Sequence, residues 1–269
     1  MTKIAVIITT YNRPDALSAV LDGYLAQSDA NFELFVADDG STLDTGQLVE
    51  AYRARSPFAI KHVWQEDRGF RAGRIRNLAI AATDAPYVIF TDGDCIPSKN
   101  FVANHRTLLE PGCFLSGNRM LLSEAFTRQI LEEKIPVHEW GVPEWIGAKL
   151  SGKVNRILPL LNLPDCCRKT SPEKWEGVKT CNLSAWRKDL LEINGFDESY
   201  TGWGLEDSDL VIRLIRSGVR HKSARFSCPV FHLWHAENDR SRLEENGRRL
   251  DLILQSAHVR ASLGLDRSS

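Results

Sequence analysis

Four bulky residues run directly into two carboxylates in the segment Tyr87-Val88-Ile89-Phe90-Thr91-Asp92-Gly93-Asp94-Cys95. An unbroken apolar run of this kind is typical of a strand buried on both faces, as in the middle of a parallel sheet. Because open α/β sheets bind ligands at the carboxyl ends of their strands, Asp92 and Asp94 are predicted to lie at a binding edge. Gly93 lets the backbone turn tightly between them. Two oxygen donors on one short loop suit Mg²⁺ or Mn²⁺, and the structural alternative is an ordinary polar turn after a strand.

Strand and helix patterns alternate through the first part of the chain. Besides the strand at Tyr87, apolar runs predict strands at residues 4–9, 32–37 and 60–64. Helices are predicted between these strands, starting at Pro14, after Ser41 and at Arg71. The alternation predicts an α/β fold whose mostly parallel central sheet has right-handed crossovers and flanking helices.

Polar loops follow three of these strands, after Thr10, at Asp38 and at Asp92. In a parallel sheet they line the same edge. Neither GxGxxG nor GxxxxGKS/T occurs, so phosphate at this edge would be held by metal and basic residues. The start of the helix predicted at Arg71 is rich in arginine, and this favours a diphosphate site that includes Arg71 and Arg74. The alternative is a solvated basic turn.

The pattern loosens after Ser98. Helices are predicted at residues 101–109, 126–135 and 187–193, and strands at residues 113–116 and 179–185. Residues 136–172 are the least regular part, where tryptophans and leucines are interspersed with lysines and arginines. This composition favours an acceptor-side flap or a peripheral contact with the inner face of a membrane, but it also fits a helix packed on its own domain.

Two later segments carry polar residues of interest. Glu206 and Asp207 begin a predicted helix, where the helix dipole favours negative charge whatever the function. The glycines that flank Trp203 indicate a loop that bends or moves. A short strand predicted at residues 229–235 carries His232 and His235. A lone histidine is usually structural, whereas a pair at the end of a strand suggests a functional site.

The bulk properties exclude several classes of protein. The chain has 269 residues, 43% hydrophobic and 26% charged, which is ordinary for a globular protein with an ample core. Its formal net charge of −1 provides no field that would recruit nucleic acid. We find neither a signal peptide nor an apolar run of about 18 residues, and therefore expect a cytoplasmic protein that does not span a membrane. The six cysteines are expected to be reduced thiols.

Taken in order, these motifs resemble the nucleotide-sugar-dependent glycosyltransferases of family 2 type, which have the GT-A fold. Residues 10–13 (Thr-Tyr-Asn-Arg) and 38–41 (Asp-Asp-Gly-Ser) match the family's nucleoside-binding segments, and Asp92-Gly93-Asp94 matches its DxD motif. Residues 194–209 resemble the acceptor-side motif of β-1,4-galactosyltransferases, polypeptide N-acetylgalactosaminyltransferases and chondroitin-polymerase domains. One departure is Leu205, where the animal galactosyltransferases carry glycine. The DxD motif alone is a weak signal, whereas all four motifs in order, over nearly the whole chain, are specific.

The resemblance implies one GT-A domain over residues 1–269. Residues 1–118 would form the nucleotide-sugar-binding half, and residues 119–269 the acceptor-binding and catalytic half. The implied reaction is metal-dependent and inverting. It moves a sugar from a nucleotide sugar, with UDP expected, to a glycan or glycolipid acceptor in bacterial surface polysaccharide synthesis.

The resemblance also implies roles for single residues. Asp207 would be the catalytic base and Glu206 its acceptor-binding partner. Asp94 and His235, with Asp92, would hold Mn²⁺ or Mg²⁺. Asp38 is expected to read the base and ribose of the nucleotide. The donor site as a whole is predicted to comprise Thr10, Tyr11, Asn12, Arg13, Asp38, Asp39, Arg71, Arg74, Asp92, Gly93 and Trp203.

Two other functions remain open at this point. A sugar-nucleotide pyrophosphorylase shares the sheet and the metal, but it would need a glycine-rich loop after the first strand, and residues 9–12 are not one. A non-catalytic nucleotide- or carbohydrate-binding protein would not need both a metal cluster and the Glu206-Asp207 pair.

Overall fold

The structure, a computed structural model, describes residues 1–237 and 239–267. Its first part alternates strands and helices as predicted. The strands are β1 (Ile4–Thr10), β2 (Phe32–Asp38), β3 (Ile60–Trp64) and β4 (Tyr87–Asp92), and the helices between them are α1 (Pro14–Leu25), α2 (Leu43–Arg53) and α3 (Ala72–Ala81). β1 pairs in parallel with β2 and β4, and β2 pairs in parallel with β3, which confirms the predicted parallel sheet.

The register of these strands brings three polar loops to one edge of the sheet. Thr10 pairs with Asp38, and Thr9 pairs with Asp92, so the carboxyl ends of β1, β2 and β4 lie level. Every residue of β2 is buried, which explains why its sequence lacks the alternation of a half-exposed strand.

The second half of the chain extends the same sheet, whose strand order is β3-β2-β1-β4-β8-β6-β9. β8 (Asn182–Trp186) is antiparallel to both β4 and β6 (Cys113–Ser116), and β9 (Arg220–Ser223) is parallel to β6. One sheet therefore contains strands from both predicted halves. The sequence did not predict β9, because its four residues, Arg-His-Lys-Ser, are polar.

A three-stranded sheet lies beside the Asp92-Gly93-Asp94 loop, in the order β5-β10-β7. Its strands are β5 (Cys95–Pro97), β7 (Arg119–Leu121) and β10 (Val230–His232). β10 is antiparallel to β5, with His232 opposite Cys95. This pairing places His232, from the last part of the chain, next to the Asp92-Gly93-Asp94 loop. β5 and β7 have three residues each, too few for a periodic pattern to reveal them.

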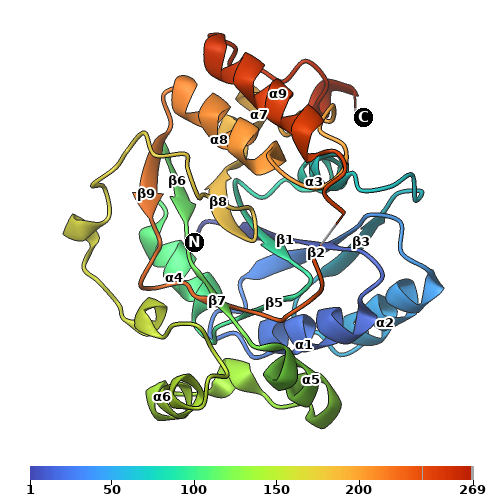
Figure 1. Cartoon of the computed structure of the whole chain (residues 1–269), viewed down its shortest axis with the longest axis vertical. Helices are drawn as coiled ribbons and strands as arrows, with labels where there is room; N and C mark the ends of the chain where they lie inside the picture. The colour runs from blue at the N-terminus through green and yellow to red at the C-terminus, as the bar shows by residue number, and fades with distance from the viewer. Residues whose placement is uncertain (238, 268–269) are drawn as a thin grey trace.

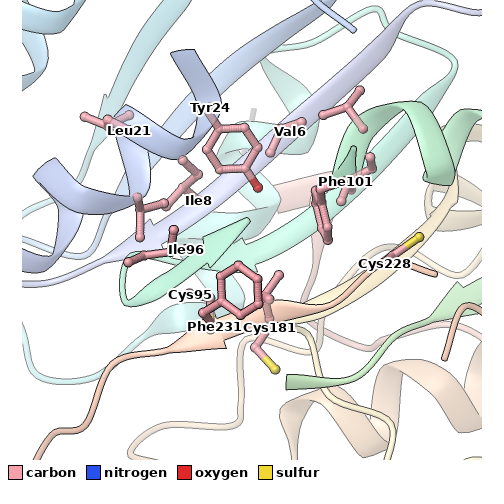
Figure 2. Packing of buried hydrophobic residues seen from close by; sticks show 14 of the residues in the cluster. Val6, Ile8, Leu21, Tyr24, Cys95, Ile96, Phe101, Cys181, Cys228 and Phe231 are labelled. Atoms are coloured by element: carbon pink, nitrogen blue, oxygen red, sulfur yellow. The ribbon is translucent and has the colours of Figure 1, made fainter. Parts of the chain in front are cut away.

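Helices cover both faces of the main sheet (Figure 1). The helices of the second half are α4 (Phe101–Leu108), α5 (Glu124–Glu133), α6 (Val142–Leu150), α7 (Arg187–Glu192), α8 (Glu206–Arg216) and α9 (Leu243–Gln255). Successive residues of β1 alternate between two apolar clusters: Val6 and Ile8 face α1, and Ala5 and Ile7 face α3 and α8. Figure 2 shows the first cluster.

The small sheet shares the core of the large one. In Figure 2, Phe231 of β10 and Ile96 of β5 lie close below Ile8 and Tyr24, and all four belong to one buried cluster. Phe231 and Ile96 are both about 1% exposed. The strand that carries His232 is therefore packed against β1 and α1 of the first half of the chain.

Residues 136–172 are more regular than the sequence predicted. They contain α6 and three short 3-10 helices, at Val137–Glu139, Leu158–Leu160 and Asp165–Cys167. Trp145 of α6 is fully buried and stacks on Phe231, with ring centroids 4.3 Å apart. One face of α6 thus packs on its own domain. Among the described residues, none of the helices is long and apolar enough to cross a membrane.

Candidate active site

The edge where β1, β2 and β4 end carries most of the predicted donor residues. Asp38 and Asp39 both lie there, but they differ in surroundings. Asp38 is fully buried: Ser41 N donates to its Oδ1 at 2.8 Å, and His62 Nε2 lies 2.9 Å from its Oδ2. Both oxygens of Asp38 are thus used to shape the loop that follows β2.

Asp39 follows Asp38 and connects this loop to the arginine-rich segment. Its carboxylate accepts hydrogen bonds from Gln65 Nε2 and from the backbone N–H of Arg71. Burial raises the pKa of Asp39 above its ordinary value, against the pull of these two donors. Arg74 donates to Gln65 Oε1 at 2.7 Å, so Arg71 and Arg74 both join the network around Asp39.

The loop after β1 lies against the same network. Tyr11 is about half exposed, and its hydroxyl donates to Asp67 at 2.8 Å, which raises the pKa of the phenol. Asn12 adopts a left-handed backbone conformation, with φ 48°, and its backbone N–H donates to Ser41 Oγ. Arg13 instead pairs with Asp15 at the start of α1.

Gly93 is needed for a close approach between strands. A Cβ atom at this position would lie 2.8 Å from Thr10 Oγ1 and 3.2 Å from the carbonyl oxygen of Thr9. The Gly93 N–H donates to that same carbonyl at 2.7 Å. The glycine therefore lets the DxD loop seat directly on the end of β1, and Thr10 lies beneath the loop.

Asp94, His232 and His235 form a compact cluster of metal-binding groups. Asp94 Oδ2 lies 3.6 Å from His232 Nε2 and 3.3 Å from His235 Nε2, and the three ligand atoms lie within 4.8 Å of one another. Burial lowers the pKa of His232, which favours the neutral imidazole that binds metals. One carboxylate with two imidazoles fits Mn²⁺ or another first-row cation better than an all-oxygen site would.

Asp92 lies outside this cluster. Its Oδ1 accepts a hydrogen bond from Arg76 Nη2 at 3.2 Å. Burial raises the pKa of Asp92 to about 6, and the charge of Arg76 opposes this shift. The side chain of Asp92 is 32% exposed. The structure thus brings the predicted ligands Asp94 and His235 together and places His232 in the same cluster. Asp92 instead bonds to Arg76.

Arg76 connects the edge where β1 and β4 end to the start of α8. Its guanidinium, only 4% exposed, donates to Thr9 Oγ1 at 2.9 Å, to Asp92, and to Glu206 Oε1 at 3.1 Å. One side chain of α3 therefore bonds to the ends of β1 and β4 and to the start of α8. Arg76 was not among the predicted site residues. It lies in the arginine-rich segment, two residues beyond Arg74.

Glu206 and Asp207 occupy the first turn of α8, and both are buried. Glu206 Oε2 is buried and has no hydrogen-bond partner among the described residues. Asp207 Oδ1 accepts from the Ser208 N–H, and Asp207 Oδ2 lies 3.5 Å from Lys179 Nζ. Burial, with the charge of Glu206, raises the pKa of Asp207 to about 6, while Lys179 and Arg76 draw it down.

The backbone just before these carboxylates is strained. Leu205 is the N-cap residue of α8 and has φ 77°, a left-handed conformation that costs a branched side chain about 1–2 kcal/mol. Gly204 before it has φ 105°. Trp203 in the same loop lies under Arg240, whose guanidinium carbon is 5.2 Å from the ring centroid. The glycine found here in animal galactosyltransferases would adopt this backbone without strain.

Arg76 and Lys179 were not among the predicted site residues, whereas His232 was noted from the sequence as the partner of His235 but was not assigned to the metal site. The spacing of His232 from His235 on one strand end was a usable signal. Lys179 lies outside every motif, and no pattern in the sequence points to it. Two surface cavities, of about 450 and 660 Å³, lie elsewhere, one beside Trp186 and one between α1 and α5, and none of these residues lines them.

Comparison with known proteins agrees with this geometry. Residues 5–167 match glycosyl transferase family 2, and residues 168–236 match the N-terminal domain of galactosyltransferase. Validoxylamine A glucosyltransferase from Streptomyces hygroscopicus subsp. jinggangensis is 29% identical over 231 residues, 80% of this chain and 52% of that protein. Chondroitin synthase from Escherichia coli is 29% identical over 233 residues, 82% of this chain and 33% of that protein. The chain thus spans about half the length of the first relative and a third of the second.

Solved structures show the same fold at low identity. S. aureus TarS in complex with UDP superposes with a TM-score of 0.63 and 16% identity, covering 99% of this chain and 68% of that one. The mannosyltransferase PcManGT from Pyrobaculum calidifontis, in complex with GDP-Man and Mn²⁺, gives a TM-score of 0.56 and 19% identity, covering 86% of this chain and 56% of that one. With the family match over more than half of its length, the chain belongs to glycosyltransferase family 2 and has the GT-A fold.

Proposed function

We propose that this protein transfers a sugar from a nucleoside diphosphate sugar, with UDP as the expected nucleotide, to a hydroxyl of a glycan or glycolipid acceptor. The reaction would invert the anomeric centre and serve bacterial surface polysaccharide synthesis. One observation carries the proposal: Arg76 bonds at once to Asp92 of the DxD loop and to Glu206, next to a carboxylate whose pKa is raised to about 6. A pyrophosphorylase or a binding module gives no reason for that link.

On the donor side, the network of Asp39, Arg71 and Arg74 and the half-exposed ring of Tyr11 supply contacts for a nucleoside diphosphate. Asp94, His232 and His235 would hold a divalent cation, which acts as a Lewis acid on the leaving diphosphate when bound. Asp92, held by Arg76, is left to contact the donor sugar or ribose rather than the cation.

On the acceptor side, Asp207 would remove the proton from the attacking hydroxyl. Its Oδ2 has a 3.5 Å ion pair with Lys179, longer than a hydrogen bond, and can accept one. A carboxylate with a pKa of about 6 is mostly ionised at neutral pH and is still a better proton acceptor than an ordinary aspartate. Glu206 would bind the acceptor beside this base, and its buried Oε2 has no hydrogen-bond partner among the described residues.

The test is a screen of nucleotide sugars with the purified protein. UDP-sugars are first ranked by thermal stabilisation in the presence of Mn²⁺, because a donor that binds only the folded state raises the melting temperature. The best donor is then incubated with Mn²⁺ and an acceptor glycan, and release of the nucleoside diphosphate is measured with the Asp207→Asn variant as control.

The proposed function requires release that depends on Mn²⁺ and on Asp207. Consumption of pyrophosphate, with formation of a nucleoside triphosphate, would identify a pyrophosphorylase instead. Binding without turnover for any donor and acceptor pair would leave the chain as a binding module. The anomeric configuration of the product, read by NMR, decides between inversion and retention.

A further inference from the structure

Exposed apolar side chains are concentrated in one segment of the chain, residues 142–163. Six of the sixteen exposed large apolar side chains of the described chain lie in this segment: Val142, Ile146, Leu150, Leu158, Leu161 and Leu163. The other ten are spread over the rest of the described chain. Scattered apolar residues are normal on a protein surface, whereas a contiguous group marks an interaction site.

Half of this group forms a stripe along α6. Val142, Ile146 and Leu150 are spaced four residues apart, so they share one helix face, and they are 56%, 44% and 83% exposed. Trp145 and Ala148, on the opposite face, are buried against the domain. α6 is thus anchored on one side and presents apolar residues on the other. Figure 1 shows it below β7 and to the left of α5, at the end of the molecule opposite α9.

The same segment is basic. Residues 142–163 contain Lys149, Lys153 and Arg156 against Glu144, a net charge of +2, whereas the whole chain has −1. The carboxylate of Glu144 is used at the start of the helix, where it accepts from the Gly141 N–H at 3.0 Å. Arg156 is exposed and has no ion pair among the described residues. Lys153 lies over the Phe126 ring and donates to Gln129 Oε1, so the exposed cations of the segment are Lys149, on α6 itself, and Arg156.

We propose that residues 142–163, the apolar–basic ridge, dock on an anionic lipid bilayer. Apolar residues on a short helix next to lysine and arginine are the pattern of a helix that lies in the interface between headgroups and acyl chains. The positive charge complements the headgroups. The described chain has no helix that could span a membrane, so this contact would hold the protein on the surface rather than through it.

The ridge is also connected to the proposed active site. Trp145, on the buried face of α6, stacks on Phe231, and the next residue of β10 is His232 of the metal cluster. Docking through α6 would fix the orientation of the cluster relative to the bilayer. Binding to lipid does not depend on the proposed function, and only the use of this orientation for a lipid-linked acceptor rests on it.

The experiment is co-sedimentation of the purified protein with vesicles. We expect binding to mixed phosphatidylglycerol–phosphatidylcholine vesicles at low salt, release at high salt, and little binding to phosphatidylcholine alone. Ile146→Glu should weaken binding at least about tenfold, because it removes an apolar contact and adds a negative charge. Arg156→Gln should weaken it about fivefold.

Matched controls lie at the other end of the molecule. Leu252 of α9 is 67% exposed, so Leu252→Glu makes the same kind of change outside the ridge, and Arg248→Gln does so for charge. Both controls should bind as the wild type does, and so should Asp207→Asn, which separates docking from catalysis.

Failure to sediment with anionic vesicles at low salt would overturn the proposal. Equal losses in Ile146→Glu and Leu252→Glu would also overturn it, since the ridge would then have no special role. Light scattering supplies a further readout on the same proteins. A dimer that Ile146→Glu dissociates would mean that a second copy covers the ridge, and the lipid proposal would be wrong.

Discussion

Lys179 Nζ lies 3.5 Å from Asp207 Oδ2, and it comes from a segment with no recognisable motif. The Lys179 side chain is 42% exposed, and its charge acts on Asp207 together with those of Glu206 and Arg76. It lowers the pKa of Asp207, which burial raises. Lys179 is therefore placed to keep the proposed base ionised.

We expect Lys179→Met to raise the pKa of Asp207 above its value of about 6. A larger fraction of Asp207 would be protonated at pH 6, so transfer there should fall about threefold to tenfold and recover toward pH 8. The measurement is the pH dependence of kcat/KM. Lys179→Arg preserves the charge and should leave the acid limb of the pH profile of kcat/KM at the same pH as in the wild type. An unmoved acid limb in Lys179→Met would show that Lys179 has no influence on the base.

Asp207→Asn should separate stability from catalysis. Transfer should fall by about 10² to 10⁴, because asparagine cannot take the proton, while UDP affinity is retained. Stability should rise at pH 7. The pKa of Asp207 is raised in the folded state, so the folded protein loses stability as the pH increases from about 4 to about 6. Asparagine removes that loss, by about 1–3 kcal/mol.

The melting temperature of Asp207→Asn, compared with wild type at pH 4 and pH 7, tests this expectation. The variant should gain at pH 7 and not at pH 4. A structural helix-capping role predicts the reverse, with a lower melting temperature at pH 7 and near-normal transfer. In that case Glu206 becomes the next candidate for the base.

Asp92 and Asp94 should respond differently to the same substitution. Asp94→Asn removes a carboxylate from the histidine cluster and should weaken Mn²⁺ binding at least about tenfold. Asp92→Asn should change Mn²⁺ affinity by no more than a few fold, because Asp92 bonds to Arg76. Electron paramagnetic resonance of free Mn²⁺ measures both affinities. Equal losses in the two variants would place Asp92 among the metal ligands.

Leu205→Gly should stabilise the protein although it shortens an apolar side chain. Glycine adopts φ 77° without strain, and the gain is partly offset by the greater freedom of glycine in the unfolded chain. The net expectation is about 0.5–1 kcal/mol, measured by urea unfolding. Leu205→Ala retains the strain and serves as the control. A loss of stability in Leu205→Gly would mean that the side chain of Leu205 contributes more by packing than the backbone costs.

The sequence revealed the elements that are long and buried. The strands from Ile4, Phe32 and Tyr87 were recognisable because most of their residues are apolar, and their alternation with helices predicted the parallel half of the sheet. The strands β5, β7 and β9 are short or polar, and tertiary pairing alone defines them. Helix α5 begins at Glu124, two residues before the predicted start, because Ser123 caps the helix: its side chain accepts a hydrogen bond from the Phe126 N–H.

The site residues were predictable where a motif carried them, but their contacts were not. Asp38 has the position expected of a nucleotide-reading residue, yet both of its oxygens are bonded within the protein. Alanine at position 38 should therefore reduce stability by about 1–3 kcal/mol in addition to any effect on UDP binding. Arg76 and Glu206 are 130 positions apart in the sequence, and Lys179 and Asp207 come from different segments. No local sequence pattern encodes such contacts.

The bond between Arg76 and Glu206 crosses the boundary between the two matched family segments, residues 5–167 and 168–236. Exchanging one segment between relatives is an obvious route to new donor and acceptor combinations. In such a chimera, loss of Arg76 would leave Glu206 as a buried carboxylate without its cation, at a cost of several kcal/mol, and loss of Glu206 would leave Arg76 with Asp92 as its remaining ion-pair partner. The two segments can be recombined only if the matching partner for this pair travels with them.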